Sequence, residues 1–427
     1  MHLPAPSRCL LAASLLLLPL ACDEKTTPQT PAPSPLTATI PTPQEPPRDD
    51  QVRAVTAPNN VVVPAKTAFS EASLGRLTVP PGFRINVFAQ GLTNPRTLAV
   101  RADGTVYVTE REAGRVTLLR DTNGDGRADQ QLPVATGLGQ KREGVHGLAL
   151  DGDRLFMTTD RQVLAADVRT DGTLGTPTVV VDRLPDAGQH ANRTLAFGPD
   201  GQLYVSVGST CNACSEPNPE SATLLRMAAD GTGRTVFARG LRNTIGFGWH
   251  PVTGQLWGMD HGSDSRGDDF PPEELNLIQQ GSDYGWPFCA GKRVVDNFIS
   301  AEPPDMLSRP DYCARTQPSV LEYQGHSAPM TWVFYTGSQF PAEYRNDAFV
   351  AMRGSWNRNP PTGYKVVRVR FDAQGTPTAI EDFATGWLVD GGTGQLGRLV
   401  GTAVATDGAL LVTDDAQGVV YRISYGG

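Results

Sequence analysis

Short runs of apolar residues recur along the chain, each followed across a tight turn by a second run. Thr194–Phe197 leads into Gly-Pro-Asp-Gly at residues 198–201, and the run Leu203–Val207 follows. Proline presets φ in such a turn and glycine supplies a positive φ, so this stretch predicts a β-hairpin. Similar hairpins are predicted at residues 102–109, 151–157, 252–257 and 406–412, with a weaker copy at 344–350.

The hairpins lie roughly fifty residues apart, which is the spacing of propeller blades. A longer gap after Trp257 holds an insertion rich in Pro, Gly and Cys. The six copies predict an all-β fold, a six-bladed β-propeller. An array of two-sheet β-sandwiches is the alternative, and the even spacing counts against it. The strand predicted at Phe83–Phe88 is expected to complete the last blade, which ends with Val419–Tyr425.

Composition supports an all-β fold and excludes some partners. The 427 residues include 45 Gly and 35 Pro, and only 19% are charged, as in a protein dense in turns. The net charge of -8 argues against nucleic acid or an anionic membrane surface as a partner.

The first residues have the pattern of an export signal. Residues 1–22 carry a short apolar stretch, too short to span a bilayer, and end in Leu-Pro-Leu-Ala-Cys, which resembles a bacterial lipobox with Pro19 as a departure. We expect an exported protein of the periplasm or cell envelope, lipid-anchored through Cys22. Residues 23–66 are rich in Pro and Thr and predict a disordered tether, which leaves 67–427 for the propeller.

Four cysteines remain beyond the leader, at 211, 214, 289 and 313. An even number in an exported protein suggests disulfides, for which three connectivities exist. Proximity in sequence favours Cys211–Cys214 and Cys289–Cys313. The Cys-x-x-Cys could also be a redox pair or half of a zinc site. Separately, residues 121–129 begin like a calcium loop but carry Leu132 where the final Glu would stand, so a solvated turn is equally compatible.

Several motifs together resemble one family. They are His190 before the 194–207 hairpin, Gly-Leu-Arg-Asn at 240–243, Asp-His-Gly at 260–262, Glu-Glu-Leu-Asn-Leu-Ile at 273–278 and Tyr-Gly-Trp-Pro at 284–287. The set resembles the glucose/sorbosone dehydrogenase family, soluble quinoproteins that use pyrroloquinoline quinone (PQQ) and calcium on a six-bladed propeller. The segments 208–214, 326–330, 334–337 and 354–358 are most similar to the L-sorbosone dehydrogenase-like branch.

The resemblance implies roles for individual residues. His190 matches the base that removes the substrate hydroxyl proton as hydride passes to quinone carbon C5, a task that suits an imidazole. Arg242 and Asn243 match the pair that holds the cofactor, and Arg242 can also stabilise a developing oxyanion. Arg398 matches an arginine that binds quinone carboxylates, and Arg353 is the candidate for a further cation, with Arg358 as its alternative.

The resemblance also implies calcium sites and shows departures. Gly262 and Ser263 match positions whose carbonyls bind the active-site calcium, and Glu274 is similar to a ligand of a structural calcium. A solvated acidic loop is the alternative for the carboxylates of residues 268, 269, 273 and 274. His261 stands where the glucose enzymes carry Gln and is a candidate contact for the cofactor. Val400 replaces a second expected arginine, and Ser209 replaces an expected Asp.

Three further histidines, His146, His250 and His326, are expected to be packing or rim residues, although His146 could line the same pocket.

The family resemblance therefore implies a PQQ-dependent oxidoreductase. It would oxidise a sugar-type alcohol, hemiacetal or aldehyde and pass electrons to an external acceptor. A non-catalytic propeller that binds a ligand or partner is one alternative. A metal-dependent propeller lactonase is another, which the Arg and His candidates disfavour.

Overall fold

Antiparallel β-sheet dominates the computed structural model, which describes residues 60–185 and 188–426. The expected signal segment, Cys22 and most of the expected tether lie outside these residues. The all-β prediction is confirmed. Over the described ranges, no helix is long and apolar enough to cross a membrane.

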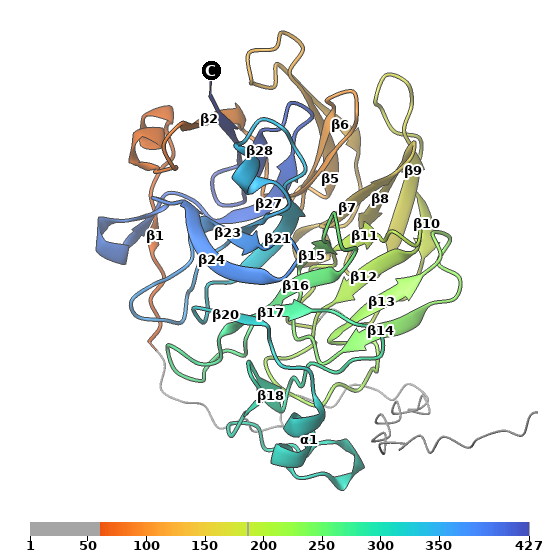
Figure 1. The fold of residues 1–427 in the computed structure, drawn as a ribbon. Coiled ribbons are helices and arrows are strands. Elements are labelled where there is room, and N and C mark those ends of the chain that lie inside the picture. The colour runs from red at the N-terminus through yellow and green to blue at the C-terminus, as the bar shows by residue number, and fades with distance from the viewer. Residues whose placement is uncertain (1–59, 186–187, 427) are drawn as a thin grey trace, which may run out of the picture. The chain divides into compact units, whose positions relative to one another are not determined.

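Six four-stranded antiparallel sheets follow one another along the described chain (Figure 1). The first contains β3 (Pro95–Val100), β4 (Val106–Glu110), β5 (Arg115–Arg120) and β6 (Gln130–Ala135). The second contains β7 (Leu148–Asp151), β8 (Arg154–Thr158), β9 (Val163–Asp167) and β10 (Thr178–Val181). The third contains β11 (Leu195–Phe197), β12 (Leu203–Val207), β13 (Thr223–Met227) and β14 (Thr235–Arg239).

The remaining sheets continue this order with two modifications. The fourth contains β15 (Gly246–Trp249), β16 (Leu256–Asp260), β17 (Glu273–Leu277) and β20 (Leu321–Tyr323). The fifth contains β21 (Pro329–Phe334), β22 (Ala348–Met352), β23 (Lys365–Phe371) and β24 (Pro377–Ala384). The sixth joins β27 (Leu399–Val404), β28 (Leu410–Asp414) and β29 (Val419–Tyr425) to β2 (Phe83–Ala89).

β2, which precedes every other strand of these six sheets in the sequence, thus completes the last sheet, as predicted. Phe83 pairs with Tyr425 and Val87 with Tyr421 across β2 and β29. The Gly-Pro-Asp-Gly hairpin is also as expected, because Leu195 pairs with Val205 and Gly201 has φ of 72°.

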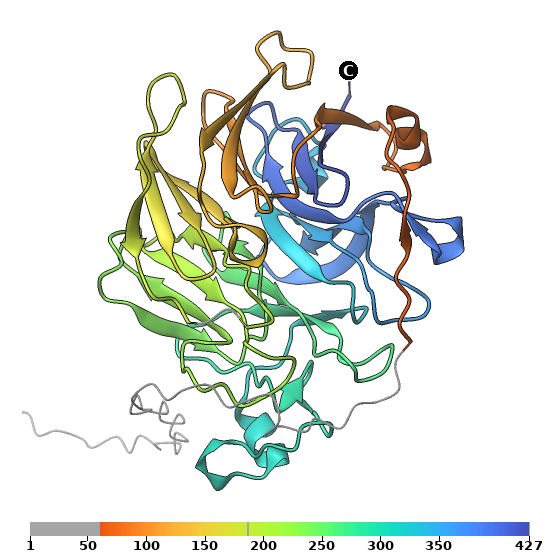
Figure 2. The same ribbon diagram turned by 180° about the vertical axis from the view of Figure 1, so that it is seen from behind.

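Smaller elements lie between these sheets. Between β17 and β20, a segment containing β18 (Cys289–Ala290), β19 (Val294–Val295) and α1 (Arg309–Arg315) projects beyond the fourth sheet in both views (Figures 1 and 2). Short 3-10 helices occur at Glu71–Arg76, Lys141–Glu143, Pro304–Met306, Ala342–Tyr344 and Asp390–Gly392.

Residues before the expected domain start at 67 already contact the sheets. β1 (Ala65–Lys66) pairs in parallel with β26 (Gly394–Gln395), which pairs with β25 (Leu388–Val389). Val62 N donates to Trp356 O at 3.1 Å. The described part of the expected tether therefore lies along the folded domain.

Burial decreases from the second strand of each sheet to the fourth. β4, β12, β16, β22 and β28 are buried at every position, whereas β6 is exposed at its first four residues. Both faces of the second strands are covered because neighbouring sheets pack against them. Trp257 of the fourth sheet and Val350 of the fifth, for example, belong to one core cluster. The continuous apolar runs in the sequence are explained by this double coverage.

The first strands of all six sheets line one central cavity of about 360 Å³. Within each sheet, the start of the first strand pairs with the end of the second, as Pro95 does with Glu110 and Leu399 with Asp414. Residues just before a first strand and just after a second strand therefore come together at one edge of every sheet.

Candidate active site

A second cavity, of about 340 Å³, lies where these sheet edges meet. Its lining is strongly polar and includes Arg96, Arg111, Gln189, His190, Asn192, Arg242, Asn243, His261, Gly262, Asp264, Glu273, His326, Arg353, Trp356, Asn357 and Arg398. Seven of the residues predicted to be catalytic or to bind the cofactor or metal are among them: His190, Arg242, Asn243, His261, Gly262, Arg353 and Arg398. Ser263, Glu274 and Arg358 are not.

His190 is oriented by a single neighbouring residue. Its Nδ1 lies 3.0 Å from Ser209 O and 2.8 Å from Ser209 Oγ. The carbonyl oxygen can only accept, and the Ser209 hydroxyl already donates to Cys211 O at 2.7 Å. Nδ1 must therefore carry the proton in the neutral ring, which leaves the lone pair on Nε2.

Burial lowers the pKa of His190 well below its ordinary value, and the positive charge of Arg242 lowers it further. The ring is therefore neutral at physiological pH. A neutral imidazole with its Nδ1–H anchored is suited to accept a proton at Nε2. Ser209, which stands where an Asp was expected, supplies the anchoring contact through its carbonyl and hydroxyl oxygens.

Arg242 and Asn243 are held through their backbone by a buried carboxylate. The Arg242 and Asn243 N–H groups both donate to Asp260 at 2.8 Å, as does the Thr244 hydroxyl. Burial raises the pKa of Asp260 to about 6, although these donors favour its charged form. The side chain of Arg242 is 3% exposed and pairs with Asp264 at 3.1 Å.

Two arginines that sequence reasoning missed also line the cavity. Arg96 lies at the start of β3 and Arg111 directly after β4, so both are at the converging sheet edge. Their Nε atoms are buried without a hydrogen-bond partner. The signal that could have found them is positional, because by register Arg96 corresponds to Val400 and Arg111 to Asp415, so both lie at the sheet edge that Arg398 also reaches. Val400, by contrast, is fully buried in the core.

One buried carboxylate organises this group of arginines. Asp415 pairs with Arg353 at 2.9 Å and also with Arg96. Burial would raise the pKa of Asp415, but Arg353 and Arg96 outweigh that effect and hold it below the ordinary value. Burial lowers the pKa of Arg398 to about 10, which still leaves it charged at neutral pH.

The five cavity arginines, Arg96, Arg111, Arg242, Arg353 and Arg398, face only two lining carboxylates, Asp264 and Glu273. The cavity is therefore electropositive although the whole chain is acidic. Such a surface attracts a ligand with several negative charges, and planar guanidinium groups bind carboxylates in matched pairs of hydrogen bonds.

The adjacent glutamates of β17 lie in different surroundings. Glu273 lines the cavity, where its carboxylate accepts from Gly262 N at 3.0 Å and Ala328 N at 2.8 Å. Glu274 is outside the cavity and accepts from Gly291 N and Asn276 Nδ2. Burial raises the pKa of each to about 8. Side chains alternate along a strand, which explains why the neighbours diverge.

The calcium-type sequence at 121–129 forms a turn stabilised by its own amides. Asp121 accepts from Gly124 N at 2.7 Å and Gly126 N at 2.8 Å. The described residues contain one cluster of three His, Cys, Asp or Glu side chains at metal-binding distances, and it lies elsewhere, at Cys211, Cys214 and Glu216.

The remaining histidines differ in position. His146 is buried behind Arg96, whose Nη2 lies 3.3 Å from His146 Nε2. His250 packs between Phe334 and Phe371 and accepts from its own turn. His326 lines the cavity and lies 3.3 Å from Asn357. His261, also in the lining, contacts the Pro329 carbonyl through Nε2, and burial lowers its pKa to about 4.

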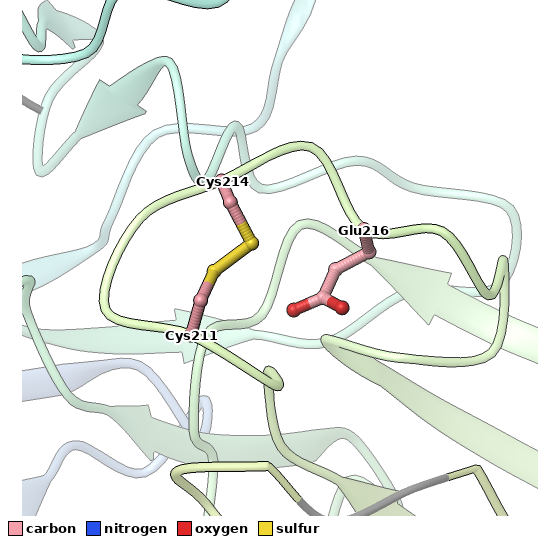
Figure 3. Close-up of side chains that lie close together, drawn as sticks. All are labelled: Cys211, Cys214 and Glu216. Atoms are coloured by element: carbon pink, nitrogen blue, oxygen red, sulfur yellow. A yellow bond between two sulfur atoms is a disulfide. The ribbon is translucent and has the colours of Figure 1, made fainter. Parts of the chain in front are cut away.

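Both disulfides expected from the sequence are present. Cys289–Cys313 joins β18 to α1 in the insertion, and Cys211–Cys214 closes a small ring after β12. Figure 3 shows the carboxylate of Glu216 beside this second disulfide. Its oxygens accept from Thr210 N at 2.6 Å and Thr210 Oγ1 at 2.7 Å.

Four-stranded sheets grouped around a central cavity define the β-propeller class of proteins. More narrowly, the chain belongs to the TrAA12-like family, whose profile matches residues 77–426. The resemblance to soluble quinoprotein sugar dehydrogenases is thereby confirmed at the level of the family.

Individual relatives agree with this assignment. The pyrroloquinoline quinone-dependent sugar dehydrogenase of Hypocrea jecorina is 25% identical over 356 residues, which cover 71% of this chain and 77% of that protein. The family AA12 structure from Trichoderma reesei has a TM-score of 0.71 and 21% identity, covering 87% of this chain and 100% of that one. The holo PQQ domain of Coprinopsis cinerea pyranose dehydrogenase has a TM-score of 0.69 and 23% identity, covering 86% and 100%. At such identities the structural likeness shows a shared fold.

Proposed function

We propose that this protein is a PQQ-dependent sugar dehydrogenase built as a six-bladed propeller, with its active site in the arginine-lined cavity. The observation that carries the proposal is the convergence of His190, its Nε2 lone pair free, with five arginines in one cavity. Family membership supports the same activity. The substrate we propose is a sugar-type alcohol, hemiacetal or aldehyde, with a sorbosone-like compound as one candidate.

The residues present fit the proposed cofactor. PQQ carries several carboxylates on a planar ring, and the unpartnered Nε atoms of Arg96 and Arg111 are donors still to be satisfied. Arg398, Arg353, Arg242 and Asn243 would hold the group together with these two. When bound, the quinone would supply a two-electron acceptor for the substrate hydride, and an external acceptor would reoxidise it.

The chain's own residues perform the proton chemistry. His190 Nε2 takes the proton from the substrate hydroxyl while the carbon of that group loses hydride, so a carbonyl product forms. Nδ1–H stays on the Ser209 oxygens, which stabilise the imidazolium that results. The positive charge of Arg242 opposes a lasting charge on His190 and thereby favours rapid proton release to solvent.

The first experiment is a titration of the purified protein with PQQ in calcium, followed by an aldose panel with a dye acceptor. We expect quinone binding and sugar-dependent dye reduction. Binding without turnover on any sugar would remove the proposed substrate class. No binding at micromolar quinone would overturn the proposal and favour a non-catalytic ligand-binding propeller.

The activity should remain high at mildly acidic pH. His190 is active when neutral, so kcat/KM should rise with pH through the pKa of His190 and then stay level. Because burial and Arg242 place that pKa well below the ordinary 6.5, the level region should extend below pH 6.5. Initial rates after a matched incubation at each pH control for unfolding. An inflection at or above pH 6.5 would contradict the proposed base.

We propose that calcium binds at the Glu273 side of the cavity. We propose the carbonyls of Gly262 and Ser263 as ligands, with the Glu273 carboxylate, because hard oxygen donors suit this ion. Glu273→Gln should weaken calcium affinity by at least about 10-fold. Glu274→Gln is the matched control from the neighbouring position, and titration calorimetry on the apoprotein measures both. If only Glu274→Gln weakens binding, the ion is at the structural site instead.

For the cellular setting we propose export, with the tether and an acylated Cys22 holding the domain at the cell envelope. The disulfides support export, because such bonds persist in oxidising compartments. Metabolic labelling with a fatty acid, lost in Cys22→Ser, tests the anchor.

A further inference from the structure

A single loop contacts both residues on which the proposed reaction depends. This loop, Ser209–Glu216, follows β12 and is called the clamp loop below. At its start, Ser209 holds His190 Nδ1. Three residues later, Asn212 holds the side chain of Arg242.

Asn212 contacts Arg242 through two different oxygens. Its backbone carbonyl accepts from Arg242 Nε at 2.9 Å, and its side-chain Oδ1 accepts from Nη2 at 2.9 Å. The same side chain is fixed by Asp264, whose N–H donates to Oδ1 at 2.7 Å and whose carbonyl accepts from Nδ2 at 3.0 Å. The Nε and Nη2 edge of the Arg242 guanidinium group is therefore bound by Asn212, which is neutral.

This arrangement leaves the other edge of Arg242 available. Nε is bonded to Asn212, and Nη2 to Asn212 and Asp264. Across the described residues, no protein group accepts from Nη1, and Arg242 lines the cavity. Nη1 is therefore the donor of Arg242 that remains for a ligand in the cavity.

The clamp loop is itself immobilised from two sides. The Cys211–Cys214 disulfide closes a ring that contains Asn212. Glu216 bonds to Thr210, whose carbonyl accepts from Gln189 N at 2.8 Å next to His190. Movement of this ring would therefore shift the contacts of His190 and Arg242 together.

We infer that Asn212 is a positioning residue for Arg242, and that the Cys211–Cys214 disulfide holds Asn212 and Ser209 in fixed positions beside the cavity. This inference rests on the proposed function. It gives the Cys-x-x-Cys a structural task at the site, in place of the redox or zinc alternatives.

A double-mutant cycle tests whether Asn212 acts through Arg242. Asn212→Ala should lower kcat/KM and quinone affinity by about 10–100-fold, the size expected when a catalytic group is displaced by about 1 Å. In the Arg242→Ala background, Asn212→Ala should change quinone affinity less than about 2-fold, because the partner is already gone. Quinone affinity is measured by absorbance titration, so turnover is not required.

Asn218→Ala is the matched control, since Asn218 lies in the same connection and bonds only to Glu220 N and Ser221 N in its neighbourhood. It should leave kcat/KM within about 2-fold of the parent, as for surface positions outside a site. An equal loss from Asn212→Ala in both backgrounds, or no loss in either, would overturn the inference.

The two disulfides provide a second comparison. Cys211→Ser/Cys214→Ser opens a link of sequence separation 3, whereas Cys289→Ser/Cys313→Ser opens one of separation 24. Chain entropy predicts the larger stability loss for the longer loop. We expect the first variant to lose more quinone affinity and the second to lose more in Tm. The opposite ranking in affinity would remove the disulfide from the proposal.

A measurement without cofactor separates this inference from the proposed function. In the apoprotein, the Arg242 Nη2–H protons should exchange with solvent more slowly than in Asn212→Ala, which removes the Oδ1 acceptor, or in Cys211→Ser/Cys214→Ser, which opens the ring that holds it. If quinone does not bind the parent protein but this difference appears, the proposed function fails and the positioning contact stands. If exchange is the same in all three proteins, the positioning contact is wrong.

Discussion

Replacing His190 with Gln is expected to lower kcat by about 10³–10⁴-fold while leaving quinone affinity within about 3-fold, at the upper end of what general-base removal costs. The glutamine side chain is close in size to imidazole and can keep a hydrogen bond to Ser209. It has no lone pair of useful basicity to accept the substrate proton. Stopped-flow reduction of the quinone by sugar in a single turnover measures the affected step directly.

Two comparisons make this result specific. His326→Gln changes another histidine of the same lining, one whose Nε2 is already 2.9 Å from the Gly267 carbonyl. It should cost far less in the single-turnover rate than His190→Gln. If both variants reduce the rate equally, or if His190→Gln turns over at the parental rate, His190 is not the base.

Replacing Arg111 and Arg398 together with Gln is expected to weaken PQQ binding by about 10³-fold. A hydrogen bond to a charged group contributes about 1.5–3 kcal/mol, which corresponds to about 10–100-fold for each arginine. Arg111 has a buried Nε with no partner, so its donor is available to a ligand. Arg398 donates to Gly354 O at 2.8 Å and still lines the cavity.

The matched control removes two positive charges elsewhere. Arg154 and Arg370 form exposed ion pairs with Asp167 and Glu381, so Arg154→Gln/Arg370→Gln has the same net charge as the test variant. It should bind quinone like the parent. Equal binding by the test and control variants would exclude the arginines as carboxylate ligands. Arg96 is unsuitable for this test, because its loss would leave buried Asp415 short of a partner.

The sequence predicted the sheets well because their signals are local. Turn residues such as Gly201 and the apolar runs on either side specify each hairpin, and the structure contains them where expected. The pairing of Phe83–Phe88 with the last strand was also predictable, since a propeller requires closure. The sequence did not predict that contacts with the folded domain begin near Asn60. Residues 60–66 pack through backbone hydrogen bonds, which composition does not reveal.

The candidate site was predictable only where motifs exist. His190, Arg242 and Arg398 belong to recognisable motifs and do meet in one cavity. Arg96 and Arg111 belong to none, and their positions follow from strand register, which becomes visible only when the strands are paired. The sequence likewise does not reveal which of Glu273 and Glu274 lines the cavity, because this depends on which face of β17 points toward it. The link from Asn212 to Arg242 spans 30 residues and depends on loop conformation.

The sheet that joins β2 to β29 has a consequence for synthesis of the protein. β2 is made long before β29, so the complete sheet can form only after residue 425 has been made. Arg398 directly precedes β27 and Asp415 directly follows β28 of this sheet, and both contact Arg353. We therefore expect the complete cation group to assemble only after β29 has been made and has paired with β2.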